Sequence, residues 1–209
     1  METDARGSAA ADARDRVVRW AMGALYLFSL FAVAGYASFG LHPRLLDAVP
    51  GVAGFYGTSF VFFSRTQVWL AAAVLGATLS LYCGRRWLPA LAVLYLLSLS
   101  SELLGVGVGL PFGEYHYTAT LGPKWLGMVP VLIPLSWFFM AVPSYALARW
   151  ALGGGRTAAR VLLASFLLLS WDLVLDPAMS HVTAYWVWGE TGPYYGMPLL
   201  NLLGWYLTG

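Results

Sequence analysis

The chain has 209 residues and a formal net charge of +2, and 59% of its residues are hydrophobic while 11% are charged. Soluble domains carry roughly 25% charged residues, so this chain has too few charges to cover the outside of a water-soluble fold. The composition therefore excludes an ordinary soluble domain and favours one polytopic membrane domain, and the scattered basic residues form no stripe that would bind nucleic acid.

The predicted elements begin with a polar N-terminal tail. Residues 1–15 are rich in alanine, alternate acids with bases and lack an apolar core, so they do not form a signal peptide. We expect a disordered or surface-lying tail here and a single transmembrane domain over residues 16–209. That domain is predicted to be all-α, a polytopic membrane helix bundle with about six transmembrane helices.

Apolar runs of about 20 residues mark the predicted spans. They cover residues 17–39, 67–83, 88–110, 125–150, 157–176 and 197–209. The last run is only about 20 Å long as a helix. We therefore expect either that the natural protein is longer or that this helix stops inside the membrane.

Residues 48–63 are apolar, but Pro50 and three glycines interrupt the run. Basic residues gather on the inner side of a membrane, so their distribution between the two sides indicates whether this segment spans. With six spans and an inner N-terminus, inner segments hold nine of the twelve Lys and Arg residues, whereas a further span at 48–63 divides them six and six. We therefore predict a re-entrant or interfacial segment near 48–63 and a cytoplasmic N-terminus in the inner cell membrane.

Two predicted outer loops, 111–124 and 177–198, are dense in Tyr, Trp, Gly and Pro. One interpretation is an aromatic belt at the membrane interface. The loops also resemble each other, because Phe-Gly-Glu at 112–114 and Trp-Gly-Glu at 188–190 are each near two tyrosines. Each loop follows a span that carries a carboxylate, which is consistent with an internal repeat of two helix pairs.

Three carboxylates lie within or at the end of two predicted spans. Glu102 is about 12 Å below the outer end of its span at Leu110, and Asp172 is about 6 Å deep. Asp176 closes the second of these spans and shares a helix face with Asp172, because the two are four residues apart. An ionisable group inside a membrane is costly, so we predict a function; the alternative is that these groups only fix helix packing.

None of the three carboxylates has a nearby Arg or Lys within its span, and burial without a cation favours the neutral carboxyl group. We expect Glu102, the deepest, to be protonated near neutral pH and to act as a general acid. Asp172 and Asp176, nearer to water, are expected to stay ionised. Asn201 adds a polar group at the outer end of the last span.

No metal site and no cofactor are predicted. The three histidines, His42, His116 and His181, are widely spaced, and the single cysteine, Cys83, excludes a thiolate cluster or an intrachain disulfide. The glycines at 105–109 lack the preceding strand that a dinucleotide-binding loop needs and are more typical of close helix packing.

Three groups of residues together resemble the membrane-integral carotenoid biosynthesis family. They are Glu102 with Pro111-Phe112-Gly113-x-Tyr115-x-Tyr117, then Trp171-Asp172 with Asp176-Pro177, then Trp188-x-x-x-Gly192, Tyr194-Tyr195-Gly196-x-Pro198-x-x-Asn201 and Gly204-Trp205. The likeness covers about residues 95–205. This family includes carotenoid 1,2-hydratases and bisanhydrobacterioruberin hydratases.

The resemblance implies a hydro-lyase that adds water, without a cofactor, to the terminal C1=C2 double bond of an acyclic carotenoid. Protonation of C2 gives a tertiary cation at C1, which water captures. Glu102 fits the acid, and Asp172, assisted by Asp176 or Asn201, fits the group that holds and deprotonates water. The predicted substrate-binding residues, whose rings would face the cation, are Tyr115, Tyr117, Trp171, Trp186, Trp188, Tyr194 and Tyr195, together with Asn201.

The expected substrate is a lycopene-like or C50 carotenoid, a rod about as long as the hydrocarbon core of a membrane, which would enter sideways from lipid. Membrane lipid and other enzymes of carotenoid synthesis are expected partners. Alternatives stay open: an end-group cyclase that forms the same cation but loses a proton, a proton-coupled carrier, or a non-enzymatic carotenoid-binding protein. The polar set of Asp172, Asp176 and Asn201 favours held water, and hence hydration, over cyclisation.

Overall fold

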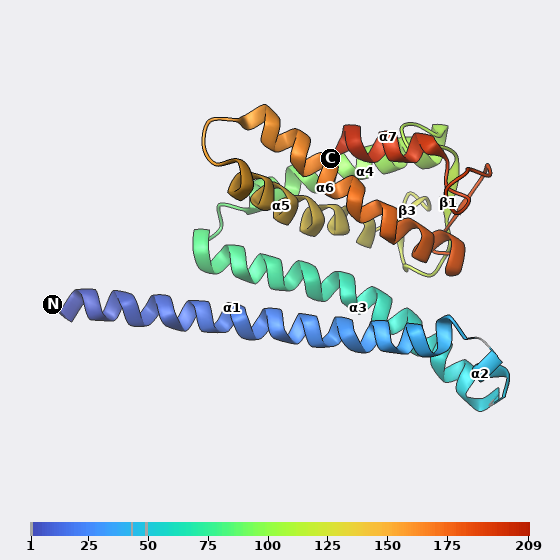
Figure 1. Cartoon of the computed structure of the whole chain (residues 1–209), viewed down its shortest axis with the longest axis horizontal. Coiled ribbons are helices and arrows are strands. Elements are labelled where there is room, and N and C mark those ends of the chain that lie inside the picture. Colours follow the sequence, from blue (N-terminus) through green and yellow to red (C-terminus); the bar gives the residue numbers. More distant parts are fainter. Residues whose placement is uncertain (1, 43, 49) are drawn as a thin grey trace. The chain divides into compact units, whose positions relative to one another are not determined.

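The computed structural model describes residues 2–42, 44–48 and 50–209. The chain divides into two compact units, Met1–Ala90 and Leu91–Gly209, and both are mainly helical (Figure 1). Within these described residues, four stretches are long and apolar enough to cross a membrane: Ser8–Gly40, Gly51–Cys83, Leu88–Val108 and Thr157–His181. Several apolar helices of this kind agree with the predicted helical membrane protein.

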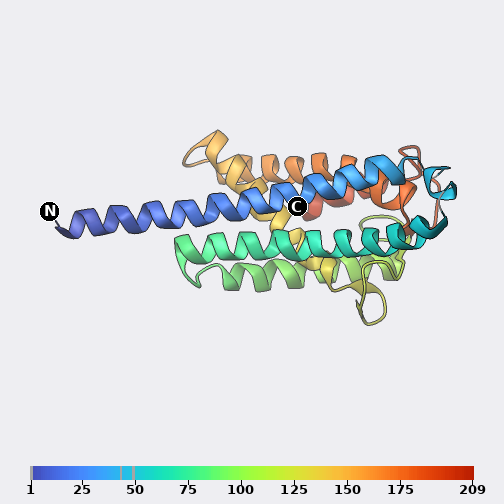
Figure 2. The same ribbon diagram turned by 90° about the horizontal axis from the view of Figure 1, so that it is seen from below.

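The N-terminal unit is a hairpin of two long helices. Helix α1, Glu2–Gly35, continues as a π-helical turn, Tyr36–Gly40, and α3, Pro50–Cys83, runs back beside it (Figure 2). The short helix α2, Arg44–Asp47, lies in the connection. Proline is favoured at the first helical position because its missing N–H is not needed there, so Pro50 begins α3.

Helix α3 corrects the prediction for residues 48–63. Residues 50–63 are helical and continuous with 67–83, so the described residues form no separate re-entrant or interfacial segment. Gly51, Gly54 and Gly57 resemble helix breaks in the sequence, but a helix in lipid bonds its own backbone and tolerates glycine. A Cβ atom added at each would meet nothing within 4 Å, so no close contact requires these glycines.

The remaining helices revise the number of spans. The run 125–150 forms α5, Leu132–Leu152, and the run 197–209 forms α7, Leu199–Thr208; neither is among the four candidate spans. Helix α5 begins later than predicted because Lys124–Trp125 and Val129–Pro130 form the short strands β2 and β3. The predicted count of about six transmembrane helices is therefore not confirmed.

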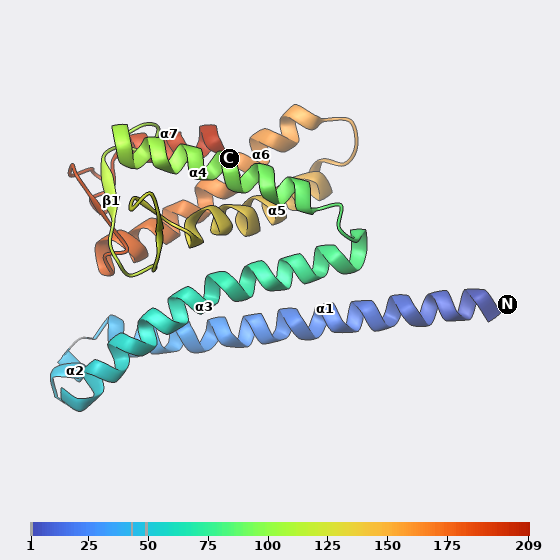
Figure 3. The same cartoon turned by 180° about the vertical axis from the view of Figure 1, so that it is seen from behind.

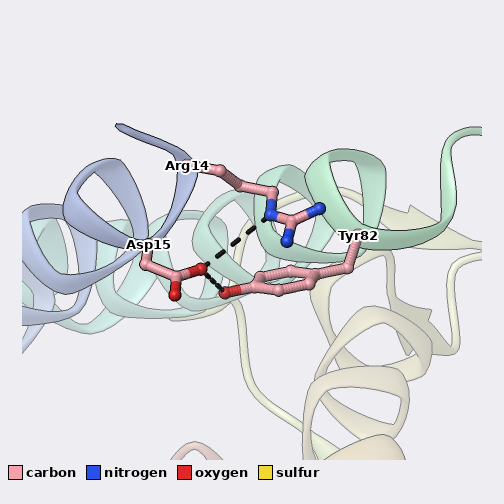
Figure 4. Close-up of polar contacts among 3 residues, drawn as sticks. All are labelled: Arg14, Asp15 and Tyr82. Carbon is pink, nitrogen blue, oxygen red and sulfur yellow. Dashed lines mark hydrogen bonds and ion pairs between the residues drawn. The ribbon is translucent and has the colours of Figure 1, made fainter. Parts of the chain in front are cut away.

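Residues 2–15 differ from the expected disordered or surface-lying tail, because they form the start of α1. The Tyr82 hydroxyl of α3 donates a 2.5 Å hydrogen bond to Asp15 Oδ1, and the guanidinium carbon of Arg14 lies 4.3 Å from the centre of the Tyr82 ring (Figure 4). Arg14 Nε also lies 3.9 Å from Asp15 Oδ1. These contacts join α1 to the last turn of α3.

The C-terminal unit contains α4, Leu88–Val108, from Leu91 onward, followed by α5, α6 and α7. Helix α6, Thr157–Asp176, packs against both α5 and α7 and continues as a π-helical turn, Pro177–Val182. Figure 3 shows strand β1 beyond the C-terminal end of α4. The carboxylates of interest lie on α4 and α6, near this end of the helices.

Two small antiparallel sheets make the all-α prediction incomplete. Strand β1, Tyr115–Tyr117, pairs with β4, Trp186–Trp188, and β2 pairs with β3. The sequences Tyr-His-Tyr and Trp-Val-Trp alternate in the two-residue period of a strand. In β1 the two tyrosines are buried and the histidine between them is exposed. This pairing brings the two aromatic loops together.

A polar contact inside the helical hairpin gives a first prediction. Gln67 Nε2 of α3 donates to Ser29 Oγ of α1 at 2.9 Å. We expect a double-mutant cycle of S29A and Q67L to give a coupling energy of about 0.6 kcal/mol, as measured for polar pairs between membrane helices. Thermal unfolding in detergent, followed by circular dichroism, measures it.

The control for this cycle is T58V, because Thr58 Oγ1 donates within its own helix, to Gly54 O at 3.1 Å. A Q67L variant that is no less stable than T58V, with no coupling to S29A, would contradict the prediction.

Candidate active site

Glu102 lies on the buried face of α4, where three neutral groups donate to its carboxylate. The residue is 4% exposed. The hydroxyls of Tyr115 and Tyr117 donate to Oε2 at 2.5 and 2.8 Å, and Trp137 Nε1 of α5 donates to Oε1 at 2.9 Å. Strand β1 directs both hydroxyls to the same place because alternate residues of a strand share a face.

The two tyrosines stay protonated and so remain donors. Burial, and next the charge of Glu102, raise the pKa of Tyr115 and of Tyr117 well above the ordinary value. A phenol with a raised pKa keeps its proton at neutral pH. Both hydroxyls can therefore donate to Glu102 throughout the physiological range.

Asp172 and Asp176 form a second buried group on α6, and each is 1% exposed. Asn201 of α7 donates through Nδ2 to Asp172 Oδ2 at 2.9 Å and to Asp176 Oδ2 at 3.0 Å. Asp176 Oδ1 also accepts from Ser180 Oγ at 2.7 Å and from Trp186 Nε1 at 3.2 Å. Asp172 Oδ1 is buried and has no hydrogen-bond partner among the described residues.

The strand pair β1–β4 connects these two groups. Tyr115 is opposite Trp188 and Tyr117 is opposite Trp186, with ring centroids 5.4 and 6.0 Å apart. The tyrosines bond to the carboxylate of α4, and Trp186 bonds to a carboxylate of α6. One layer of aromatic rings therefore holds both sets of acids.

Asp172 lies within electrostatic reach of both Asp176 and Glu102. The three acids thus belong to one site rather than to two. We name it the carboxylate cluster, and it consists of Glu102, Asp172, Asp176, Asn201, Tyr115, Tyr117, Trp186 and Trp188.

Trp137 and Trp205 adjoin the carboxylate cluster. Trp205 belongs to the motifs of the family resemblance, whereas no motif includes Trp137. Trp137 bonds to Glu102, and its ring stacks on that of Trp205 with centroids 4.3 Å apart and planes 16° apart. A tryptophan in an apolar helix looks like a packing residue. The signal in the sequence is that a buried indole N–H needs an acceptor, and Glu102 is the acceptor predicted to lie deepest in the spans.

Three of the predicted substrate-binding residues, Trp171, Tyr194 and Tyr195, lie outside the cluster. Trp171 is 54% exposed, because the residue next to Asp172 on a helix points about 100° away from it. Tyr195 is 58% exposed and packs edge-on against Tyr194, with ring centroids 5.1 Å apart. Tyr194 is half-buried and donates to Leu173 O at 2.9 Å, so it supports α6 rather than the acids themselves.

All three acids are buried within the protein. Glu102 is 4% exposed and Asp172 and Asp176 are each 1% exposed, and the expected order of their depths below the membrane interface stays a prediction. Three buried acids beside aromatic faces can transfer a proton and stabilise a cation. Among the described residues, no group of three or more His, Cys, Asp or Glu side chains is arranged to hold a metal ion.

Comparison with known proteins gives the family. Residues 60–209 match the family model described as carotenoid biosynthesis protein. The chain belongs to the carotenoid biosynthesis protein family. This membership confirms the resemblance noted from the sequence, and every residue of the carboxylate cluster lies within the part matched by the family model.

A curated relative of this carotenoid biosynthesis protein is bisanhydrobacterioruberin hydratase from Haloarcula japonica. The two are 39% identical over 127 residues, which are 60% of this chain and 43% of the relative. The chain therefore spans less than half the length of that relative. No solved structure matches the chain.

Two glycines of α4 provide a matched test of the Glu102 environment. A Cβ atom at Gly105 would lie 2.7 Å from the Tyr115 hydroxyl, whereas one at Gly107 would meet nothing within 4 Å. We expect G105A to displace Tyr115 from Glu102 and to destabilise the protein by about 1–3 kcal/mol, as overpacking does. G107A should be neutral or slightly stabilising, because alanine favours a helix.

The midpoint of thermal unfolding in detergent compares the two glycine variants. Equal midpoints for G105A and G107A would show that Tyr115 is not held against α4.

Proposed function

We propose that this protein is a carotenoid hydratase, a hydro-lyase that adds water to the terminal C1=C2 double bond of an acyclic carotenoid. The family and the hydratase name of the relative support this proposal. The structural observation that carries it is the unpartnered Asp172 Oδ1 within a buried cluster of three carboxyl groups. Hydration of an alkene needs one such free position for a proton or a water molecule.

The chemistry of the cluster suits a cationic reaction. Protonation of C2 places positive charge on C1, where the faces of aromatic rings and nearby carboxylates stabilise it. Trp186, Trp188 and the two tyrosines of β1 provide the rings. The carboxyl groups and Asn201 provide polar groups that hold the attacking water, which supports hydration over cyclisation by proton loss.

The substrate class follows from the setting of the site. A lycopene-like or C50 carotenoid would enter from lipid with its reacting end at the cluster, near the C-terminal ends of α4 and α6. Membrane lipid and other enzymes of carotenoid synthesis are the proposed partners. The distribution of basic residues supports placement in the inner cell membrane with a cytoplasmic N-terminus.

Expression in a bacterium that accumulates lycopene tests the proposed activity. We expect the extracted pigment to gain the mass of one or two water molecules while its absorption spectrum stays unchanged. E102Q and D172N should each lower product by about 10²-fold or more, the usual size of a lost acid–base or electrostatic group. The exposed Asp47 gives a control, D47N, that should keep full activity.

Unchanged mass with a blue-shifted spectrum would indicate a cyclase instead. Unaltered lycopene and unaltered C50 carotenoid, with the protein present in the membrane, would contradict an enzyme acting on acyclic carotenoids.

A further inference from the structure

We propose that Asp172 donates the proton in this reaction, through Oδ1, whereas Glu102 and Asp176 act as bound carboxylates. This inference rests on the proposed hydratase function for its chemical meaning. It reverses the role that the sequence suggested for Glu102.

The numbers of donors differ sharply between the acids. Glu102 accepts three hydrogen bonds, from two hydroxyls and an indole. Asp176 also accepts three, from a hydroxyl, an indole and an amide. Asp172 accepts one, from Asn201. An ionised carboxylate only accepts hydrogen bonds and is favoured by each donor, while a protonated one needs an oxygen that is free to donate.

Asp172 and Asp176 are held together by one amide group. The Nδ2 atom of Asn201 donates to both, so two negative charges would face each other in a buried place. Two like charges that share one amide donor disfavour ionisation of both carboxyl groups, so the pair keeps one proton. Since Asp176 uses both oxygens as acceptors, the proton fits Asp172 Oδ1, which has no donor opposite it.

Glu102 is suited to a different task. Tyr115 and Tyr117 keep their protons because their pKa values are raised, and the indole N–H of Trp137 can only donate. These fixed donors maintain a carboxylate within electrostatic reach of Asp172. Glu102 therefore stabilises the cation that forms next to Asp172, and Trp137 is a positioning residue for Glu102.

The proposed reaction uses the proton of Asp172 and returns one to it. The Asp172 Oδ1–H bond breaks, and its proton forms a bond to C2 with the electron pair of C1=C2, which leaves the cation at C1. A water oxygen then forms a bond to C1, and one proton of that water passes to Asp172. The products are a tertiary alcohol and the original protonated acid, so the acid is regenerated in each turnover.

Infrared difference spectroscopy of the detergent-purified protein at neutral pH tests where the proton is held. A protonated carboxyl group has its own C=O stretching band, which shifts in D₂O. We expect this band in the wild type, in E102Q and in D47N, but not in D172N. Absence of the band from the wild type, or its loss in E102Q, would overturn the proposal, and neither outcome depends on enzyme activity.

Product formation distinguishes the two aspartates. We expect D172N to lower product by about 10²–10⁴-fold, whereas D176N, which keeps the proton donor Asp172, retains measurable product. W137F keeps an aromatic ring but loses the indole N–H, and should lower turnover about tenfold without removing the infrared band. D176N that is as inactive as D172N, or W137F that loses the band, would overturn the assignment.

The product measurement tests the proposed function, and the infrared measurement tests independently which residue holds the proton. If the wild type hydrates no carotenoid, the proposed function fails, while the infrared band still decides which residue holds the proton.

Discussion

The burial of three carboxyl groups among neutral donors is the constraint on which the C-terminal unit depends. The groups that bond to these acids are phenol, indole, hydroxyl and amide groups, and none carries a charge. A carboxylate removed from water without such partners would cost several kcal/mol. The fold meets this requirement by placing strands at the ends of helices, so that aromatic N–H and O–H groups reach the buried oxygens.

The same arrangement occurs twice in the chain. Helix α4, strand β1 and helix α5 form one half, and α6, β4 and α7 form the other. In each half an acid on the first helix accepts from an aromatic residue on the strand and from a side chain on the second helix. Glu102 has Trp137 in this last position, whereas Asp176 has Asn201. Pairing of β1 with β4 joins the halves at the two aromatic loops.

The acids could be found from the sequence because a charge inside an apolar run is conspicuous whatever the fold. Trp137 could not, because an indole in a helix resembles any packing residue until its acceptor is known. Trp171 is next to Asp172 in the sequence, but adjacent residues on a helix face different directions. The pairing of β1 with β4 could not be predicted, because it joins segments from distant parts of the chain. The continuous helix α3 could not be predicted either, because its glycines look alike whether a helix bends there or continues.

Helix α7 connects the parts of the site. Asn201 and Trp205 are one turn apart on it; Asn201 bonds to both aspartates, while Trp205 stacks on the indole that holds Glu102. A Cβ atom at Gly204 would lie 2.7 Å from Pro111 O, so the helix rests directly on the loop before β1. Helix α7 contacts both aspartates directly and reaches Glu102 through Trp137. Docking of this one short helix therefore positions the surroundings of all three acids. A site built in this way has its donors in place before substrate arrives, as stabilisation of a developing cation requires.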